Sequence, residues 1–361
     1  MSLVDWLLNR NNRLIGLDVG VSGIKAVELY GEERPRLVAY NRVPLPFDTV
    51  SPEGEVKDRE ALVAALKTLF QTTNFSSKKV AIGACGNSVI TKKISLPKMP
   101  SEELGHQLYW EAEQYLPFPL DAVNLDFAIL GSSRQTVSSE KPMMDVLLVA
   151  AKKDYVATLS SVIEEAGLQP KVIDIQAFAL GNVFEYNYGH RSQNETSSSV
   201  IVDFGAGSTK VSIVEGDKTV FTRELRQSGF QCTQVLSEGL GISIEEAETI
   251  KIFESQTEAV KKIVDEFTLQ LGQELGKTID FFLGQGSDRL VDGIYICGGA
   301  SKTRGLLKTL ESVLPYPISI LDPIQHVSGS GQKMSADAIR EISYLGAVAI
   351  GLSLRKLGDR P

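Results

Sequence analysis

Two segments of this chain, 185 residues apart, repeat one pattern, and this repeat limits the fold more than any other feature. Each segment is an apolar run that ends in Asp-x-Gly, at Asp18 and at Asp203. A lysine stands seven residues after each aspartate, at Lys25 and Lys210, and apolar residues resume behind it. Each copy predicts a strand, a tight glycine turn and a second strand. Because the period is far too long for a solenoid, we expect two copies of one domain.

The composition narrows the kinds of partner. The chain has 361 residues, which is more than one core accommodates. It carries 37 Lys and Arg against 45 Asp and Glu, so its formal net charge is −8, which argues against nucleic acid as a partner. The cysteines Cys85, Cys232 and Cys297 are widely separated, and there are three histidines. This pattern argues against a zinc site or a disulfide framework and suits a reducing, cytosolic compartment.

The expected organisation follows from the repeat. The first lobe is expected at 1–190, with an inserted subdomain at about 90–165, and the second lobe at 199–361, with an insertion at about 232–290. Residues 190–198 are polar and rich in serine, as expected of a connection between lobes. Periodicity predicts helices at 58–71, 101–115, 154–166, 245–254 and 259–282.

The beginning of the chain does not resemble a secretory signal. Residues 3–8 are mostly apolar but include Asp5, and no basic region precedes them. These residues could form a short apolar lid or touch a membrane surface, but we expect a terminal turn that packs on the body. No apolar run reaches the ~20 residues that span a bilayer.

The glycine turns have a chemical purpose if they face an anion. Glycine lets backbone N–H groups turn toward a phosphate and approach it closely, and hydroxyl and ammonium groups can add further contacts. A carboxylate repels phosphate unless a cation lies between them, so Asp18 and Asp203 imply Mg²⁺. One such turn alone would be an ordinary hairpin, but two matched copies favour phosphate binding. The expected phosphate-binding residues are Gly20, Ser22, Gly23, Lys25, Gly205, Gly207, Ser208 and Thr209.

Further candidates lie in the second half of the chain. A third glycine turn, with Gly298, Gly299 and Ser301, follows an apolar run and could lie against a purine and its ribose. Glu248 and Lys251 are three residues apart on one predicted helix, so they share a face. Their spacing fits contacts to a ribose and an adenine as well as it fits a solvated surface ion pair.

One candidate catalytic group comes from the first lobe. Asp174 could orient an attacking water, or it could be a hinge residue bonded to the backbone. We favour the hinge interpretation slightly.

These motifs resemble those of the actin and heat-shock-chaperone ATPase superfamily. Its two phosphate motifs are similar to residues 17–25 and 202–209, its adenosine motif to 296–301, and its two interlobe helices to 175–186 and 343–354. The resemblance implies an α/β, actin-like two-lobed ATPase fold. In that fold, duplicated ribonuclease-H-like domains each carry an inserted subdomain, and ATP binds with Mg²⁺ in the cleft.

Four further segments stand close together: Leu-Pro-Lys-Met-Pro at 96–100, Glu-Glu-Leu at 102–104, Trp-Glu-Ala-Glu-Gln-Tyr-Leu-Pro-Phe-Pro at 110–119 and Val-Asn-Leu-Asp at 123–126. They resemble the PilM family of type IV pilus assembly proteins, in the branch that contains the division protein FtsA. The resemblance implies a cytoplasmic, ATP-binding assembly factor that reaches the inner membrane through a partner. That partner is the cytoplasmic N-terminal peptide of a PilN-like membrane protein, docked in a groove to which residues 90–130 contribute. Other pilus platform proteins and motor ATPases are further partners that it suggests.

Two alternatives remain open from the sequence. The chain could be a filament-forming cytoskeletal protein like FtsA, or a sugar or acetate kinase of the same superfamily. A kinase needs a base in the cleft, and Asp174 is the one candidate, so we expect slow ATP hydrolysis at most. The aromatic residues Trp110, Tyr115 and Phe118 fit either a peptide groove or the core of a small subdomain.

Overall fold

The computed structural model describes residues 13–31, 34–132, 142–189, 197–252, 257–285, 289–327 and 334–359. Residues 3–8 and most of the predicted connection at 190–198 therefore lie outside the described residues. The strands are β1 (Ile15–Gly20), β2 (Gly23–Tyr30), β3 (Arg36–Pro44), β4 (Lys79–Ala84), β5 (Val89–Pro97), β6 (Val123–Ser132), β7 (Met143–Lys152), β8 (Gln169–Ile175), β9 (Ser197–Phe204), β10 (Thr209–Glu215), β11 (Lys218–Leu225), β12 (Leu290–Cys297) and β13 (Ile318–Ile320). The α-helices are α2 (Arg59–Gln71), α3 (Ser101–Ala112), α4 (Lys153–Glu165), α5 (Gln176–Tyr188), α6 (Gly229–Leu240), α7 (Ile244–Ile252), α8 (Glu258–Leu283), α9 (Leu306–Val313), α10 (Ala336–Leu345) and α11 (Ala347–Ser353). Short 3₁₀ turns are η1 (Gly86–Ser88), η2 (Leu120–Ala122) and η3 (Gly299–Lys302).

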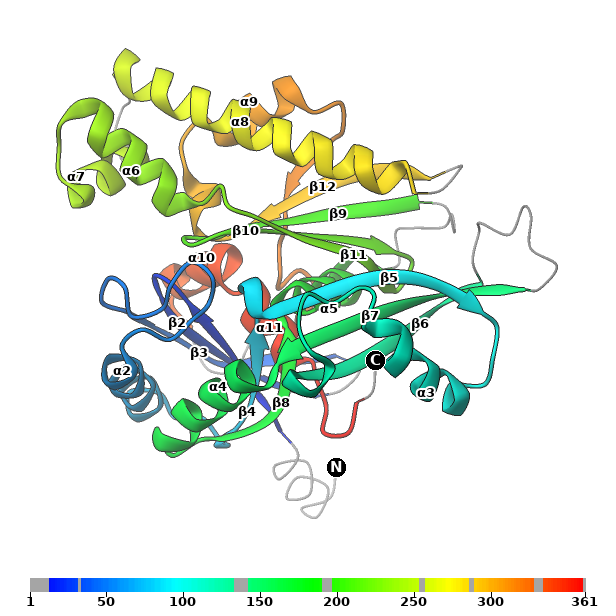
Figure 1. Ribbon diagram of the computed structural model, residues 1–361. Coiled ribbons are helices and arrows are strands. Elements are labelled where there is room, and N and C mark those ends of the chain that lie inside the picture. The colour runs from blue at the N-terminus through cyan, green and yellow to red at the C-terminus, as the bar shows by residue number, and fades with distance from the viewer. Residues whose placement is uncertain are drawn as a thin grey trace.

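The two halves of the chain build sheets of the same design. The first sheet has the order β3-β2-β1-β4-β8, and the second has the order β11-β10-β9-β12-β13. In each sheet, three antiparallel strands are followed by two parallel ones. The duplication predicted from the repeated Asp-x-Gly pattern is therefore confirmed as two equivalent lobes (Figure 1).

Local sequence explains why the outer helices form where they do. Asp58 caps α2 by accepting a hydrogen bond from the Ala61 backbone N–H at 2.9 Å. Leu62, Leu66 and Leu69 then recur at helical spacing and are fully buried against the first sheet. On the second sheet, the long helix α8 lies across the outer face, with α9 beside it (Figure 1). Each sheet thus has one face covered by outer helices and its other face toward the middle of the molecule.

The helices α5 and α11 pack together between the lobes (Figure 1). Small residues allow this contact, because a Cβ on Gly351 would lie 1.9 Å from the Ala179 carbonyl oxygen of α5. A Cβ on Gly16 would likewise lie 1.9 Å from the Ala349 carbonyl oxygen of α11. The core around these helices takes side chains from both sheets, Val27 and Ile201 among them. The first predicted interlobe helix is confirmed as α5, whereas the range 343–354 expected for the second is divided at Gly346 between the end of α10 and α11. The helices α5 and α11 link the lobes directly.

The inserted subdomain is smaller than the range expected for it. The three-stranded sheet β5-β7-β6 and α3 enclose a core of their own, which includes Leu104, Leu108 and Val146. The helix α4, which falls inside the expected range 90–165, instead packs its buried face into the core of the first lobe. In the second lobe, α6, α7 and α8 share one core with the sheet across the expected insertion at 232–290.

Candidate functional site

The first glycine turn brings Asp18 and Lys25 together. The two residues are directly opposite each other on β1 and β2, which explains their seven-residue spacing. Both are buried, and Lys25 Nζ lies 2.8 Å from Asp18 Oδ2. On its other side, Asp18 Oδ1 lies 3.5 Å from the side-chain nitrogen of Gln176, at the start of α5. The carboxylate is thus held by a cation and an amide at the point where β1 reaches the cleft.

The second turn repeats this arrangement in the other lobe. Asp203 and Lys210 are opposite each other on β9 and β10, with 4.0 Å between Lys210 Nζ and Asp203 Oδ2. Burial raises the pKa of the Asp203 carboxyl above its usual range, and Lys210 opposes that shift. Burial by itself lowers the pKa of Lys210, but neighbouring Cys85, Asp203 and Glu224 raise it overall. A buried carboxylate of this kind is stabilised in its charged form by a nearby cation, so the residues present fit a divalent ion.

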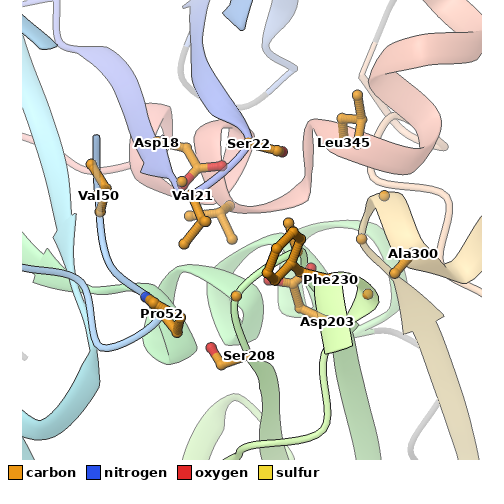
Figure 2. A pocket seen from close by; sticks show the side chains of 18 of the residues that line it. Asp18, Val21, Ser22, Val50, Pro52, Asp203, Ser208, Phe230, Ala300 and Leu345 are labelled. Atoms are coloured by element: carbon orange, nitrogen blue, oxygen red, sulfur yellow. The ribbon is translucent and has the colours of Figure 1, made fainter. Parts of the chain in front are cut away.

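The two turns face each other across a narrow gap, as Figure 2 shows with Asp18 and Val21 on one side and Asp203 and Ser208 on the other. A Cβ on Gly207 would lie 2.5 Å from Val21 Cγ2 and 3.1 Å from Pro52 Cα, both in the first lobe. Glycine is therefore required at this position for the lobes to approach each other as they do.

The turns open into one cavity of about 610 Å³ between the lobes. This volume lies in the range of small-molecule and cofactor sites. The residues predicted from sequence that line the cavity are Asp18, Gly20, Ser22, Lys25, Asp203, Gly205, Gly207, Ser208, Glu248, Lys251, Gly298 and Gly299. The structure thus brings together residues that lie far apart in the sequence, from both lobes.

Glu248 and Lys251 are not a solvated surface pair. The Lys251 side chain is 2% exposed, and its Nζ donates to Glu248 Oε2 at 2.5 Å, to Thr233 Oγ1 at 2.7 Å and to the Gly229 carbonyl at 3.0 Å. The Glu248 carboxylate remains about half exposed at the cavity wall. The pair therefore presents one anchored carboxylate to the cavity, which fits a hydrogen bond to a ribose hydroxyl.

The third glycine turn lies directly behind Asp203. Gly298 has φ +90, and a Cβ there would lie 2.4 Å from Asp203 Oδ1. The left-handed backbone and the close carboxylate both require glycine at this position. Beside it, Lys302 Nζ lies 4.9 Å from the centre of the Tyr344 ring. The ring and the glycine backbone together give this end of the cavity the flat surfaces that suit a purine.

Four predicted residues do not line the cavity. Gly23 lies at the base of the first turn, Thr209 Oγ1 donates to the Gln227 carbonyl at 2.6 Å, and Ser301 Oγ donates to the Gly298 carbonyl at 2.6 Å. These residues support the turns from behind. The fourth, Asp174, accepts a hydrogen bond from the Ile175 backbone N–H at 2.7 Å and lies 3.5 Å from the Arg355 guanidinium. Its place in this contact supports the hinge interpretation over a catalytic one.

The sequence analysis missed several residues that line the cavity, among them Gln176, Phe230 and Tyr344. Gln176 follows β8 directly, and its position at the start of an interlobe helix is a signal that the sequence does contain. Phe230 and Tyr344 carry no such signal, because tertiary packing alone brings them to the cavity. Lys210 was recognised as part of the repeat but not as a ligand.

No group of three or more His, Cys, Asp and Glu side chains with metal-binding geometry occurs among the described residues. A divalent cation in this cavity would therefore draw on Asp18 or Asp203 together with oxygens from water and from a ligand. This is how Mg²⁺ is usually held beside phosphates.

Comparison with known proteins decides the family. The family described as type IV pilus assembly protein PilM matches residues 16–357. The chain belongs to the PilM family. The solved PilM–PilN type IV pilus biogenesis complex contains a chain that is 30% identical to this one, with 95% of this chain and 98% of that chain covered and a TM-score of 0.82.

More distant relatives agree on the fold. The cell division protein FtsA of Bacillus subtilis (strain 168) is 23% identical over 380 residues, covering 90% of this chain and 83% of FtsA. The ethanolamine utilization protein EutJ from Carboxydothermus hydrogenoformans is 15% identical, with 94% and 89% coverage and a TM-score of 0.55. This PilM-family chain therefore has the predicted actin-like two-lobed fold. Within the described parts of the chain, no helix has both the length and the apolar character needed to cross a bilayer.

Proposed function

We propose that this PilM-family chain binds ATP with Mg²⁺ in the interlobe cavity and couples it to the docking of a membrane-protein peptide. The observation that supports the nucleotide most strongly is the pair of Asp–Lys contacts, one from each lobe, that face the same cavity. Two cations and two glycine turns provide donors for a chain of phosphates. Two carboxylates provide oxygen atoms that can hold a magnesium ion on the side away from the phosphates.

Each group has a definite task in this proposal. Lys25, Lys210 and the hydroxyl of Ser208 neutralise and position the phosphates, and Asp18 and Asp203 hold the metal through its waters. Bound Mg²⁺ would offset the charge of the phosphate oxygens. Gln176 holds the Asp18 carboxylate in place through its amide.

The position of Asp174 supports the assembly-factor proposal over the kinase alternative, because its carboxylate contacts Ile175 and Arg355 and does not line the cavity.

A second cavity, of about 810 Å³, supports peptide docking. It lies where the inserted subdomain meets both lobes, and its walls include Ile90, Pro117 and Phe118 from that subdomain and Ile175 from the first lobe. We propose that it binds the cytoplasmic N-terminal segment of a PilN-like inner-membrane protein. The solved complex of a similar PilM chain with PilN supports this choice of partner. The apolar part of the lining favours Leu or Ile side chains in the peptide, and polar side chains such as Arg223 and Gln231 line the rest of the cavity.

The aromatic residues of the inserted subdomain divide into two groups. Phe118 packs against the small core and lines the second cavity, whereas Trp110 is 73% exposed on the outer face of α3. This difference provides a matched pair of variants. Phe118→Ala should weaken peptide binding, and Trp110→Ala, in the same subdomain, should leave it unchanged.

Flotation of the full chain on liposomes tests the docking proposal. We expect the protein to float when the N-terminal peptide of the PilN-like protein is anchored on the vesicles, and to remain at the bottom of the gradient with bare vesicles. Phe118→Ala should reduce flotation and Trp110→Ala should not. Flotation on bare vesicles would mean that the chain binds lipid directly, and the opposite order of the two variants would place the peptide on the outer face of α3.

A further inference from the structure

Glu224, on β11, connects the second phosphate turn to the inserted subdomain. Its carboxylate accepts a hydrogen bond from the Ser208 hydroxyl on one side and from the Gly86 backbone N–H, at 2.9 Å, on the other. Ser208 belongs to the glycine turn that lines the nucleotide cavity. Gly86 belongs to the first lobe and opens η1, which leads directly into β5, the edge strand of the inserted subdomain. One carboxylate therefore joins both lobes beside the proposed phosphate site.

The Ser208 hydroxyl can donate one hydrogen bond, and in this structure it donates that bond to the Glu224 carboxylate. The Ser208 oxygen in turn accepts from Lys210 Nζ at 3.3 Å. A phosphate that binds to the glycine turn needs the same donors, Ser208 and Lys210. Phosphate and the Glu224 carboxylate therefore compete for one O–H group, and only one of them can hold it at a time.

Electrostatics strengthens this competition. Glu224 is one of the acidic groups whose charges raise the pKa of Lys210, so the two side chains already interact. A bound triphosphate would bring further negative charge to the same lysine and repel the carboxylate. Loss of the Ser208 hydrogen bond and this repulsion both favour movement of Glu224 away from the turn.

Movement of Glu224 would reach the inserted subdomain by a short path. Gly86 has φ +78, and a Cβ there would lie 1.7 Å from the Glu53 carbonyl oxygen, so its backbone packs closely against the first lobe. Next to it, Thr91 of β5 and Thr222 of β11 share a hydrogen bond of 2.5 Å between their hydroxyl oxygens. The strands β5 and β11 both form walls of the second cavity.

We propose that Glu224 is the switch through which phosphate occupancy changes the second cavity. Phosphate accepts the hydrogen bond of the Ser208 hydroxyl, Glu224 releases the Gly86 N–H, and the η1–β5 segment shifts against β11. This inference rests on the proposed function, since it needs ATP in the first cavity and a peptide in the second. If ATP tightens binding of a peptide that favours the released form, then by linkage that peptide tightens ATP binding by the same factor.

Hydrogen exchange of the full chain, with and without Mg-ATP, tests the switch. In the wild type, Mg-ATP should speed exchange of the amides of Gly86–Ser88 and the start of β5. Glu224→Ala should show fast exchange in both conditions and bind Mg-ATP roughly fivefold more tightly, because the competing carboxylate is gone. Glu53→Gln is the matched control, since it removes one negative charge from the same cavity wall, and it should behave as the wild type.

Calorimetry on the same samples distinguishes failure of the Glu224 switch from failure of the proposed nucleotide site. Binding of Mg-ATP without any change in exchange at Gly86–Ser88 would overturn the switch and leave the proposed nucleotide site intact. An equal effect of Mg-ATP on hydrogen exchange in wild type and Glu224→Ala would also overturn the switch and leave the nucleotide site intact. No binding of Mg-ATP to the wild type would overturn the nucleotide site and the switch together. Glu224→Gln provides a second variant of similar shape, in which the ATP response should be reduced.

Discussion

Replacing Gly351 by alanine should separate the two helices that join the lobes. A Cβ at this position would lie 1.9 Å from the Ala179 carbonyl oxygen and 2.6 Å from its carbonyl carbon. Both are backbone atoms of α5, so no side-chain rotation relieves the overlap. Because non-bonded carbon and oxygen atoms stay roughly 3.2 Å or more apart, the helices must move by about 1 Å or more.

The expected cost of this movement can be worked out from known substitutions. Overpacking a core costs about 1–3 kcal/mol, and the backbone clash places this site at the upper end. Alanine recovers about 0.5–1 kcal/mol through its helix propensity. The free energy of unfolding should therefore fall by about 2 kcal/mol, which corresponds to a decrease in Tm of about 3 °C for a chain of this size.

Thermal unfolding followed by circular dichroism measures this effect, and Gly276→Ala provides the control. Gly276 is also inside a helix, α8, but the nearest atom to its added Cβ is Leu314 Cδ2 at an ordinary 3.6 Å. That variant should gain about 0.5–1 kcal/mol. The same chemical change should thus have opposite signs at the two sites. A Gly351→Ala protein as stable as the wild type would refute the reasoning on interlobe packing.

Two further predictions concern buried ionisable groups. Burial raises the pKa of the Cys232 thiol to about 11 from its ordinary 9.0, so this thiol stays protonated in the folded state while the unfolded chain loses the proton. The contribution of this thiol to stability is complete below pH 9 and is lost between about pH 9 and 11. The free energy of unfolding falls there by up to ~1.4 kcal/mol per pH unit. Cys232→Ala should therefore flatten the curve of Tm against pH in that range. Asp174→Asn should lower stability by about 1–3 kcal/mol by weakening the contact with Arg355. It should leave ATP turnover unchanged and well below the roughly 1–100 s⁻¹ of kinases, and a steady-state assay showing lost turnover in this variant would restore Asp174 as a catalytic group.

The sequence was most informative where function and local structure depend on the same few residues. The seven-residue spacing from Asp18 to Lys25 and from Asp203 to Lys210 is the spacing of cross-strand partners on either side of a tight turn. A turn of this kind is set by neighbours in sequence, so it can be predicted from the sequence. The close packing of α11 could be read from the sequence for a similar reason, because the run Gly-Ala-Val-Ala-Ile-Gly at 346–351 is rich in small residues, which let helices approach each other.

Prediction failed where partners are distant in sequence. Nothing near Asp174 indicates that Arg355, 181 residues later, lies beside it. The helix α4 follows the inserted strands directly, yet its buried face belongs to the first-lobe core, so the boundary of the insertion could not be read from the sequence. Glu224 gives no signal either, because its two hydrogen-bond donors come from different lobes.

The most direct test of the account is a calorimetric titration of Mg-ATP into the wild type and Asp203→Ala. The buried Asp203 carboxylate is proposed to hold the metal through its waters, so its removal should lower Mg-ATP affinity by about 10- to 100-fold. Asp280→Ala makes the same charge change on the exposed surface of α8 and should bind as the wild type does. We predict one Mg-ATP per wild-type chain, weakened by the first substitution alone. Equal affinity in wild type and Asp203→Ala, or no binding to the wild type, would contradict the assignment of the interlobe cavity as a nucleotide site.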